Sequence, residues 1–304
     1  MLKATQVTKS YNAGKKIALK DFDLFVPTGS IYGLLGPNGA GKTTFIRIIN
    51  QILAPDRGEI FLDGEKLKPE HISSIGYMPE ERGLYKNMTL GDQILYFGEL
   101  KGLSRQVALS QAKFWFEKLD IEQWWKKKLS ELSKGMAQKV QFVVTVLHRP
   151  KLLILDEPFS GFDPVNAGLI KDQIHYLRDE GTTIILSTHR MESVEELCDS
   201  VALIHQSEKI LDGKVFEVRE KFKQNVFSVL LSEVDREALS RFSLKHEVSL
   251  VKEEPLGVSF ELHGEKDQNQ LLSELIQVGK IRSFDERIPS MNEVFIKAVS
   301  QPNF

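Results

Sequence analysis

The sequence lacks most features of secreted and membrane-spanning chains. Cysteine occurs once, at Cys198, so an internal disulfide framework is excluded and a reducing compartment is favoured. No stretch approaches the roughly 18 uncharged apolar residues that a membrane-spanning helix needs. The N-terminus, residues 1–5, lacks the hydrophobic region of a signal peptide. We therefore expect any membrane role to come through a partner chain.

A charge excess of either sign is also missing. The formal net charge is −2, which gives no reason to expect nucleic acid as a partner. With 304 residues, 41% of them hydrophobic and 27% charged, the chain suits a soluble globular protein of one large domain or two.

The most informative stretch is a glycine-rich loop at 36–44. It follows an apolar run at 31–35 that is typical of a buried strand, and it precedes the apolar start of a helix at 45–49. Glycines let successive backbone N–H groups converge on one anion, and the helix N-terminus adds partial positive charge. The sequence therefore predicts that this loop binds a nucleoside triphosphate. Its residues are Gly36, Pro37, Asn38, Gly39, Ala40, Gly41, Lys42, Thr43 and Thr44.

Individual side chains of this loop suggest particular roles. Lys42 can reach the β- and γ-phosphates, and the Thr43 hydroxyl is placed to bind Mg²⁺.

Two carboxylates, Asp156 and Glu157, end the apolar run at 152–155, and in a doubly wound sheet that end lies beside the phosphate loop. We expect Asp156 to hold Mg²⁺, directly or through water. Glu157 is expected to act as general base on the water that attacks the γ-phosphate.

The remaining pattern predicts two domains. Residues 1–218 combine strands with helical segments, and the helical periodicity at about 84–148 predicts a helical subdomain. The segment 219–304 has the order strand–helix–strand–strand–helix–strand, which predicts a small α+β domain of the ferredoxin-like type. We identify no ligand-binding constellation in it.

Three further segments carry functional side chains. Ser133 and the N–H of Gly135 form a second anion cradle at a helix N-terminus. Asp163 closes the segment 160–163, directly after the acidic pair. His189 ends the next strand, where an imidazole can donate a hydrogen bond to a γ-phosphate oxygen.

Taken together and in this order, the motifs over about residues 1–215 resemble those of the ATP-binding subunits of ABC transporters. The glycine loop resembles that family's Walker A motif, and the strand with the acidic pair resembles its Walker B motif. The segment with Ser133 and Gly135 resembles the signature motif. The segment that ends at Asp163 resembles the D-loop, and His189 resembles the switch histidine. Tyr11 stands where the family has an aromatic side chain that stacks on adenine.

The resemblance implies an α/β P-loop NTPase of the ABC type with a helical signature subdomain. It implies ATP and Mg²⁺ as cofactors and a head-to-tail homodimer, or a dimer with a related ATPase subunit. Each ATP would lie between the Walker A loop of one copy and the signature segment of the other. It further implies integral membrane permease subunits as partners, at the cytoplasmic face of the cell membrane, and export powered by hydrolysis. No nucleic acid is expected.

Two motifs depart from the family pattern. The usual signature is Leu-Ser-Gly-Gly-Gln, and here Lys134 and Met136 replace a glycine and the glutamine while Ser133 and Gly135 remain. At the Q-loop, Glu80 stands where most relatives have glutamine; its carboxylate can still bind Mg²⁺, but it adds negative charge near the triphosphate. These departures and the C-terminal extension resemble bacterial export-type ATPases, including those of sodium- and drug-extrusion systems.

Other interpretations remain open at this stage. A soluble ABC-type ATPase that acts on ribosomes or chromosomes is the main alternative, although only one Walker A motif is present and the stretch 44–151 lacks sustained heptads. A catalytically inactive binding module is disfavoured by the intact acidic pair. Leu84, Tyr85 and Met88 follow the Q-loop and suit either core packing or a groove for a partner's coupling helix.

Overall fold

The computed structural model describes residues 1–12, 14–81, 83–264 and 267–300. They divide into two compact units: Met1–Val215 together with the segment that begins at Phe295, and Phe216–Val294. The predicted domain boundary after residue 218 stays a prediction. Among the described residues, no helix combines the length and hydropathy that crossing a membrane requires.

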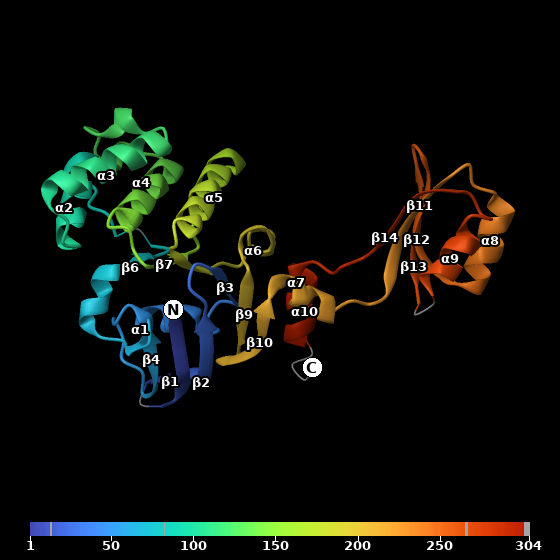
Figure 1. Ribbon diagram of the computed structural model, residues 1–304, viewed down its shortest axis with the longest axis horizontal. Coiled ribbons are helices and arrows are strands. Elements are labelled where there is room, and N and C mark those ends of the chain that lie inside the picture. Colours follow the sequence, from blue (N-terminus) through green and yellow to red (C-terminus); the bar gives the residue numbers. More distant parts are fainter. Residues whose placement is uncertain (13, 82, 265–266, 301–304) are drawn as a thin grey trace. The chain divides into compact units, whose positions relative to one another are not determined.

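The first unit contains two sheets and a set of helices (Figure 1). Its strands are β1 (Leu2–Tyr11), β2 (Lys16–Val26), β3 (Ile31–Leu35), β4 (Arg57–Leu62), β5 (Glu65–Lys66), β6 (Ile75–Met78), β7 (Leu152–Asp156), β8 (Thr183–Ser187), β9 (Ser200–His205) and β10 (Glu208–Lys214). Its helices are α1 (Lys42–Ile49), α2 (Leu90–Leu100), α3 (Arg105–Lys118), α4 (Lys134–Val146), α5 (Pro164–Asp179) and α6 (Met191–Leu197), with short 3-10 turns at Pro69–Ser74, Glu122–Trp124 and Leu129–Glu131.

The larger sheet places the functional loops at one edge. Its order is β10-β9-β3-β8-β7-β6; β3 pairs in parallel with β8 and β9, and β7 in parallel with β6 and β8. Every residue of β3, β7 and β8 is buried, which explains their uninterrupted apolar sequences. Because these strands are parallel, the loops after β3 and β7 both leave the sheet at the carboxyl ends of the strands, and only β8 lies between β3 and β7.

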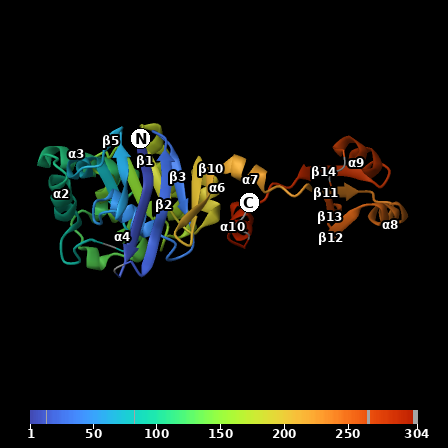
Figure 2. The ribbon, with the colours of Figure 1, turned by 90° about the horizontal axis from the view of Figure 1, so that it is seen from below.

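A second, antiparallel sheet of order β2-β1-β4-β5 completes the core. Figure 2 views the unit from the side of β1 and β2. Helix α1 contributes buried side chains to a cluster that also contains residues of both sheets. Within it, the rings of Phe22 on β2 and Phe45 on α1 meet edge to face with centroids 4.8 Å apart. This packing fixes the helix that follows the phosphate loop.

Helices α2, α3 and α4 form the helical subdomain (Figure 1). Thr89 caps α2, since its hydroxyl accepts a hydrogen bond from the Asp92 N–H at 3.3 Å. Trp115 on α3 is 2% exposed and packs edge to face on Phe142 of α4. A β-carbon at Gly91 would lie 2.3 Å from the Trp125 ring. These two tryptophans therefore serve the packing of the subdomain.

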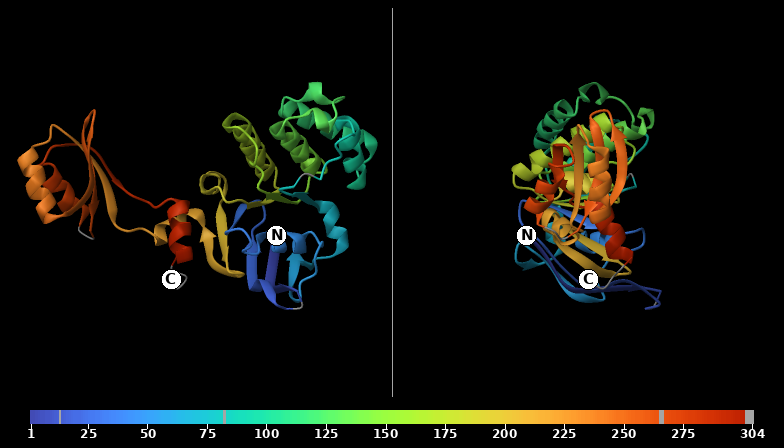
Figure 3. Two further views of the ribbon diagram at one scale, coloured as in Figure 1. Left: turned by 180° about the vertical axis from the view of Figure 1, so that it is seen from behind. Right: turned by 90° about the vertical axis from the view of Figure 1, so that its right-hand side faces the viewer.

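The second unit has the predicted ferredoxin-like topology. Its elements are β11 (Val226–Ser232), α8 (Arg236–Lys245), β12 (Glu247–Glu254), β13 (Gly257–His263), α9 (Gln268–Leu275) and β14 (Lys280–Glu286). The sheet is antiparallel in the order β12-β13-β11-β14, and α8 and α9 lie on one face of it (Figure 3). Two helices, α7 (Val215–Lys221) and α10 (Met291–Ser300), flank this module in the sequence; neither was predicted.

An ion-pair cluster joins α8 to α9 in this unit. Glu274 accepts hydrogen bonds from Lys245 at 2.7 Å and from the buried His246 ring at 2.6 Å. The hydrogen bond from Lys245, and then that from His246, lowers the pKa of Glu274 from 4.5 to about 2. The carboxylate therefore stabilises the fold fully above pH 4.5, and this contribution is lost as the pH falls towards 2.

We expect Glu274→Gln to lower the melting temperature of the second unit at pH 7, because a neutral amide cannot replace the paired carboxylate. The difference from the unchanged protein should shrink as the pH falls from 4.5 towards 2. Scanning calorimetry over this pH range measures it. Glu247→Gln, at an exposed position with no ion pair in the described part of the chain, is the matched control. Equal melting temperatures for Glu274→Gln and the unchanged protein at pH 7 would contradict the assignment.

Candidate active site

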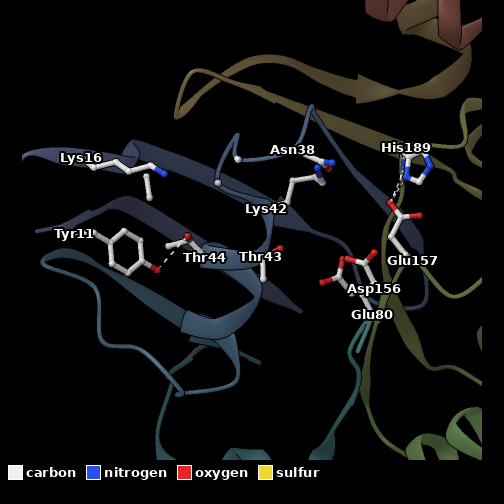
Figure 4. Close-up of a pocket in the computed structure, with 13 residues that line it drawn as sticks. Tyr11, Lys16, Asn38, Lys42, Thr43, Thr44, Glu80, Asp156, Glu157 and His189 are labelled. Carbon is white, nitrogen blue, oxygen red and sulfur yellow. Dashed lines mark hydrogen bonds and ion pairs between the residues drawn. The ribbon is translucent and has the colours of Figure 1, made fainter. Parts of the chain in front are cut away.

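A cavity of about 380 Å³ opens beside the glycine loop in the first unit. Eleven of the predicted site residues line it: Tyr11, Asn38, Gly39, Gly41, Lys42, Thr43, Thr44, Glu80, Asp156, Glu157 and His189. Lys16 and Ala18 complete the lining and were not predicted. In Figure 4, Tyr11 and Lys16 lie at one end of the cavity, the start of α1 in the middle, and the acidic residues with His189 at the other end.

The loop between β3 and α1 needs glycine at two positions. Gly36 has φ +147° and Gly41 has φ +123°, backbone conformations that other residues rarely adopt. A β-carbon at Gly36 would lie 2.3 Å from the Ile204 carbonyl oxygen, and one at Gly41 would lie 2.3 Å from that of Ala18. The loop therefore packs directly against neighbouring backbone, which holds its shape at the N-terminus of α1.

Lys42 is the cation of this loop and is largely withdrawn from solvent. Its side chain is 8% exposed, and its ammonium donates to the carbonyl oxygens of Gly36 at 2.6 Å and Pro37 at 3.1 Å. Burial lowers the pKa of Lys42, while the nearby carboxylates oppose this shift. An ammonium desolvated in this way attracts an incoming anion more strongly than a fully hydrated one. The carbonyl groups of Gly36 and Pro37 thus contribute to the site although their residues do not line the cavity.

Glu157 is fixed by hydrogen bonds at the opposite wall. One carboxylate oxygen accepts the His189 N–H at 2.9 Å and lies 2.7 Å from the Nδ1 of its ring; the other accepts the Thr188 hydroxyl at 3.1 Å. The backbone of Glu157 has φ +50°, so the chain turns sharply where β7 ends. This geometry directs Glu157 into the cavity beside His189, a contact that the sequence did not predict.

Asp156 and Glu80 form an acidic pair next to Glu157 (Figure 4). Asp156 is 5% exposed, whereas Glu80 is exposed. Burial raises the pKa of Asp156, and the carboxylates of Glu157 and Glu80 add to this effect. The three acids line the cavity together with the exposed residue Thr43, which adds a hydroxyl group. This end of the cavity therefore has several oxygen donors and an excess of negative charge.

Besides Gly36 and Pro37, four more predicted site residues do not line the cavity: Ala40, Ser133, Gly135 and Asp163. Ala40 is buried within the loop. Ser133 caps α4, where its hydroxyl accepts the Met136 N–H at 3.2 Å. A β-carbon at Gly135 would touch the carbonyl oxygen of Gly161 at 3.4 Å, so the signature segment lies against the D-loop. Asp163 caps α5 by accepting the Asn166 N–H at 2.9 Å. The structure thus leaves these last three residues outside the cavity of their own chain.

A glycine loop at the start of a helix, facing two carboxylates at the end of a parallel strand, defines a P-loop nucleoside triphosphatase. Comparison with known proteins then gives the family. A family model described as "ABC transporter" matches residues 19–160, and one described as "ATP-binding protein DrrA1-3-like, C-terminal domain" matches residues 213–299. Together with relatives that match nearly the whole chain, these matches show that the chain belongs to the family of ATP-binding subunits of ABC transporters, and it is an ATPase of that family.

Three similar proteins illustrate the relationship. The uncharacterized ABC transporter ATP-binding protein YhaQ of Bacillus subtilis (strain 168) is 40% identical over 98% of both chains. The linearmycin resistance ATP-binding protein LnrL of the same organism is 35% identical over 70% of this chain and 69% of its own. A solved structure titled "Structure of ATP binding subunit of ABC transporter" is 31% identical, with a TM-score of 0.68 over 73% of this chain and 93% of that one. The alternative of a ribosome- or chromosome-associated ATPase is not favoured.

The structure also assigns a supporting position that the sequence did not suggest. Asp56 accepts hydrogen bonds from the Ser10 N–H, the Ser10 hydroxyl and the Lys9 ammonium, each at 2.7 Å. The hydrogen bond from Lys9 is the largest cause that lowers the pKa of Asp56 to about 2. These contacts fix the end of β1 directly before Tyr11, whose own hydroxyl lies 3.3 Å from that of Thr44.

We expect Asp56→Asn to raise the KM for ATP about three- to tenfold, because the loss of charge-assisted hydrogen bonds loosens the strand end that carries Tyr11. The turnover number should stay unchanged, since Asp56 contacts Lys9 and Ser10 next to Tyr11, and Tyr11 lies at the end of the cavity opposite the acids. Steady-state ATPase kinetics measure both values, with Asp172→Asn on the exposed side of α5 as control. A changed turnover number with an unchanged KM would refute this positioning role.

Proposed function

We propose that this chain is the motor subunit of an exporter and hydrolyses Mg·ATP between two head-to-tail copies. The observation that carries the proposal is the cavity in which Lys42 faces Glu157 across the site. A triphosphate held by the loop would extend from the ammonium of Lys42 towards the carboxylate of Glu157. The name of LnrL, which refers to linearmycin resistance, supports export as the direction of transport.

Magnesium fits the acidic end of the cavity. Thr43, Glu80 and Asp156 offer hard oxygen donors, the ligand type that Mg²⁺ prefers. The raised pKa of Asp156 reflects burial and crowded negative charge, which a divalent cation would relieve. Bound there with the nucleotide, Mg²⁺ would neutralise charge that develops on the phosphates.

The residues of this chain suggest the remaining steps of catalysis. Glu157 takes the proton of the attacking water as general base. His189 holds Glu157 through its backbone N–H and its ring, and the ring, 71% exposed, is free to turn towards a γ-phosphate oxygen. Lys42 exchanges its loop carbonyl partners for phosphate oxygens when the nucleotide binds. Tyr11 stacks on adenine at the far end of the cavity.

A second copy would complete the site. Ser133 and Gly135 begin α4 outside the cavity of their own chain, so their anion cradle has no phosphate to bind there. A head-to-tail partner would bring its own nucleotide to this helix N-terminus, where backbone N–H groups and the helix dipole favour an anion. Asp163 directly follows Gly161 and Phe162, which lie against Gly135, and would then border the shared nucleotide.

Membrane permease subunits would dock on an apolar groove beside the helical subdomain, at the cytoplasmic face of the membrane. The groove is lined by Asn50, Ile52, Ile72, Tyr77, Pro79, Gly83, Leu84, Phe97, Leu100, Lys101, Gln141, Val144, Thr145 and His148. Tyr85 stacks on Phe97 at 5.9 Å yet remains 52% exposed. Of the two interpretations of the segment after the Q-loop, this exposure favours partner docking.

We expect Glu157→Gln to lower the turnover number by about 10²- to 10⁴-fold, because glutamine cannot accept the proton of the attacking water. ATP binding should persist, so that the variant accumulates as an ATP-bound dimer. Light scattering with Mg·ATP measures its size, and a coupled assay measures hydrolysis. Glu180→Gln, an exposed position at the C-terminus of α5, is the control. A monomer that hydrolyses ATP at the original rate would refute the assignment.

We expect Lys42→Ala to weaken ATP binding by about 10- to 100-fold, because a charge-assisted contact to the triphosphate is lost. Isothermal titration calorimetry with ATP measures the affinity directly. Lys3→Ala, at an exposed position of β1, should leave it unchanged. An unaltered affinity in the Lys42 variant would remove this side chain from the site.

A further inference from the structure

Lys16 lies at the end of the cavity where the base of a nucleotide would bind. It begins β2 and is the cross-strand partner of Tyr11 in the β1–β2 pairing. Directly opposed residues of an antiparallel pair project to the same face of the sheet. Both side chains line the cavity together with Ala18, and Figure 4 shows the Lys16 ammonium on the side of the phosphate loop.

The charge of Lys16 is not neutralised by the protein. In the described ranges, its ammonium has no ion pair or side-chain hydrogen bond, although two neighbouring lysines of the same sheet are paired. Lys9 contacts Asp56 at 2.7 Å, and Lys20 contacts Glu208 at 2.5 Å. The acids of the cavity lie at its other end. Lys16 is therefore an available cation on a wall where no acid competes for it.

The order of groups along the cavity determines which part of a nucleotide this cation would meet. The γ-phosphate belongs at Glu157, the β-phosphate at the loop around Lys42, and adenine at Tyr11. The α-phosphate and the ribose must then pass between Tyr11 and the loop. We propose that Lys16 binds the α-phosphate and is a further nucleotide-binding residue. This inference rests on the proposed function, since it takes ATP as the occupant of the cavity.

A contact between Lys16 and the α-phosphate has a specific consequence for nucleotide selectivity. ATP and ADP share the α-phosphate, so both should gain equally from Lys16. A contact with the γ-phosphate would instead favour ATP over ADP. Because Lys16 is exposed, solvent screening limits its effect, and we expect an affinity change of about three- to tenfold.

Calorimetric titration of the full chain with Mg·ATP and with Mg·ADP tests the proposal. Lys16→Ala should weaken both affinities by the same factor of about three to ten, and the loss should shrink as the salt concentration rises. Lys16→Arg keeps the charge and should restore most of the affinity. Lys15→Ala removes an adjacent exposed lysine that does not line the cavity and should change neither affinity.

The outcomes distinguish a failure of the Lys16 proposal from a failure of the proposed function. If the affinities of Lys16→Ala for both nucleotides lie within about 1.5-fold of those of the unchanged protein, Lys16 is only a solvated surface lysine and the inference is overturned. A loss confined to ATP would overturn it as well, because the contact would then be to the γ-phosphate. Failure of the unchanged protein to bind either nucleotide would refute the proposed function itself. Equal melting temperatures of Lys16→Ala and the unchanged protein would exclude misfolding as the cause of a loss.

Discussion

In the larger sheet of the first unit, β8 alone separates β3 from β7, and all three strands run in the same direction. This parallel arrangement brings the glycine loop after β3 to the same edge as the acids that end β7. The two regions are more than a hundred residues apart in the sequence, and no local interaction would unite them. Everything that the site can do depends on this pairing of strands.

The electrostatics of the cavity follow from that arrangement. One buried ammonium, that of Lys42, is held by loop carbonyls, while the acids Glu80, Asp156 and Glu157 gather at the opposite wall. The burial of Lys42 lowers its pKa, and the burial of Asp156 raises the pKa of that carboxyl group. In the proposed function, a phosphate would be the added partner of Lys42 and a metal cation that of Asp156.

Much of this arrangement could be predicted from the sequence, because its signals are local. The apolar runs at 31–35 and 152–155 correspond to β3 and β7, and the order of elements in the C-terminal module predicted its ferredoxin-like sheet. Other features depend on contacts that no local pattern carries. The hydrogen bond between Glu157 and His189 forms where Glu157 adopts a left-handed backbone conformation, with φ +50°. Glutamate rarely adopts this conformation, so the sequence does not indicate it.

The position of Lys16 in the cavity could not be predicted from the sequence either. Three irregularities interrupt the register of β1 and β2, between Ala4 and Val7, Val7 and Lys9, and Lys9 and Ser10. All three lie on the far side of Ser10 from the hairpin loop, so the pairing of Tyr11 with Lys16 is set by the loop itself, whose length the sequence alone did not fix. The contribution of Asp56 was missed as well, because its partners Lys9 and Ser10 lie more than forty residues earlier in the chain.

A crystal structure of the chain with Mg²⁺ and a non-hydrolysable ATP analogue would test the central claim most directly. The account predicts the triphosphate in the loop 36–44, with the Lys42 ammonium on phosphate oxygens and the γ-phosphate facing Glu157. A nucleotide bound elsewhere, with Lys42 still on the carbonyl groups of Gly36 and Pro37, would contradict it.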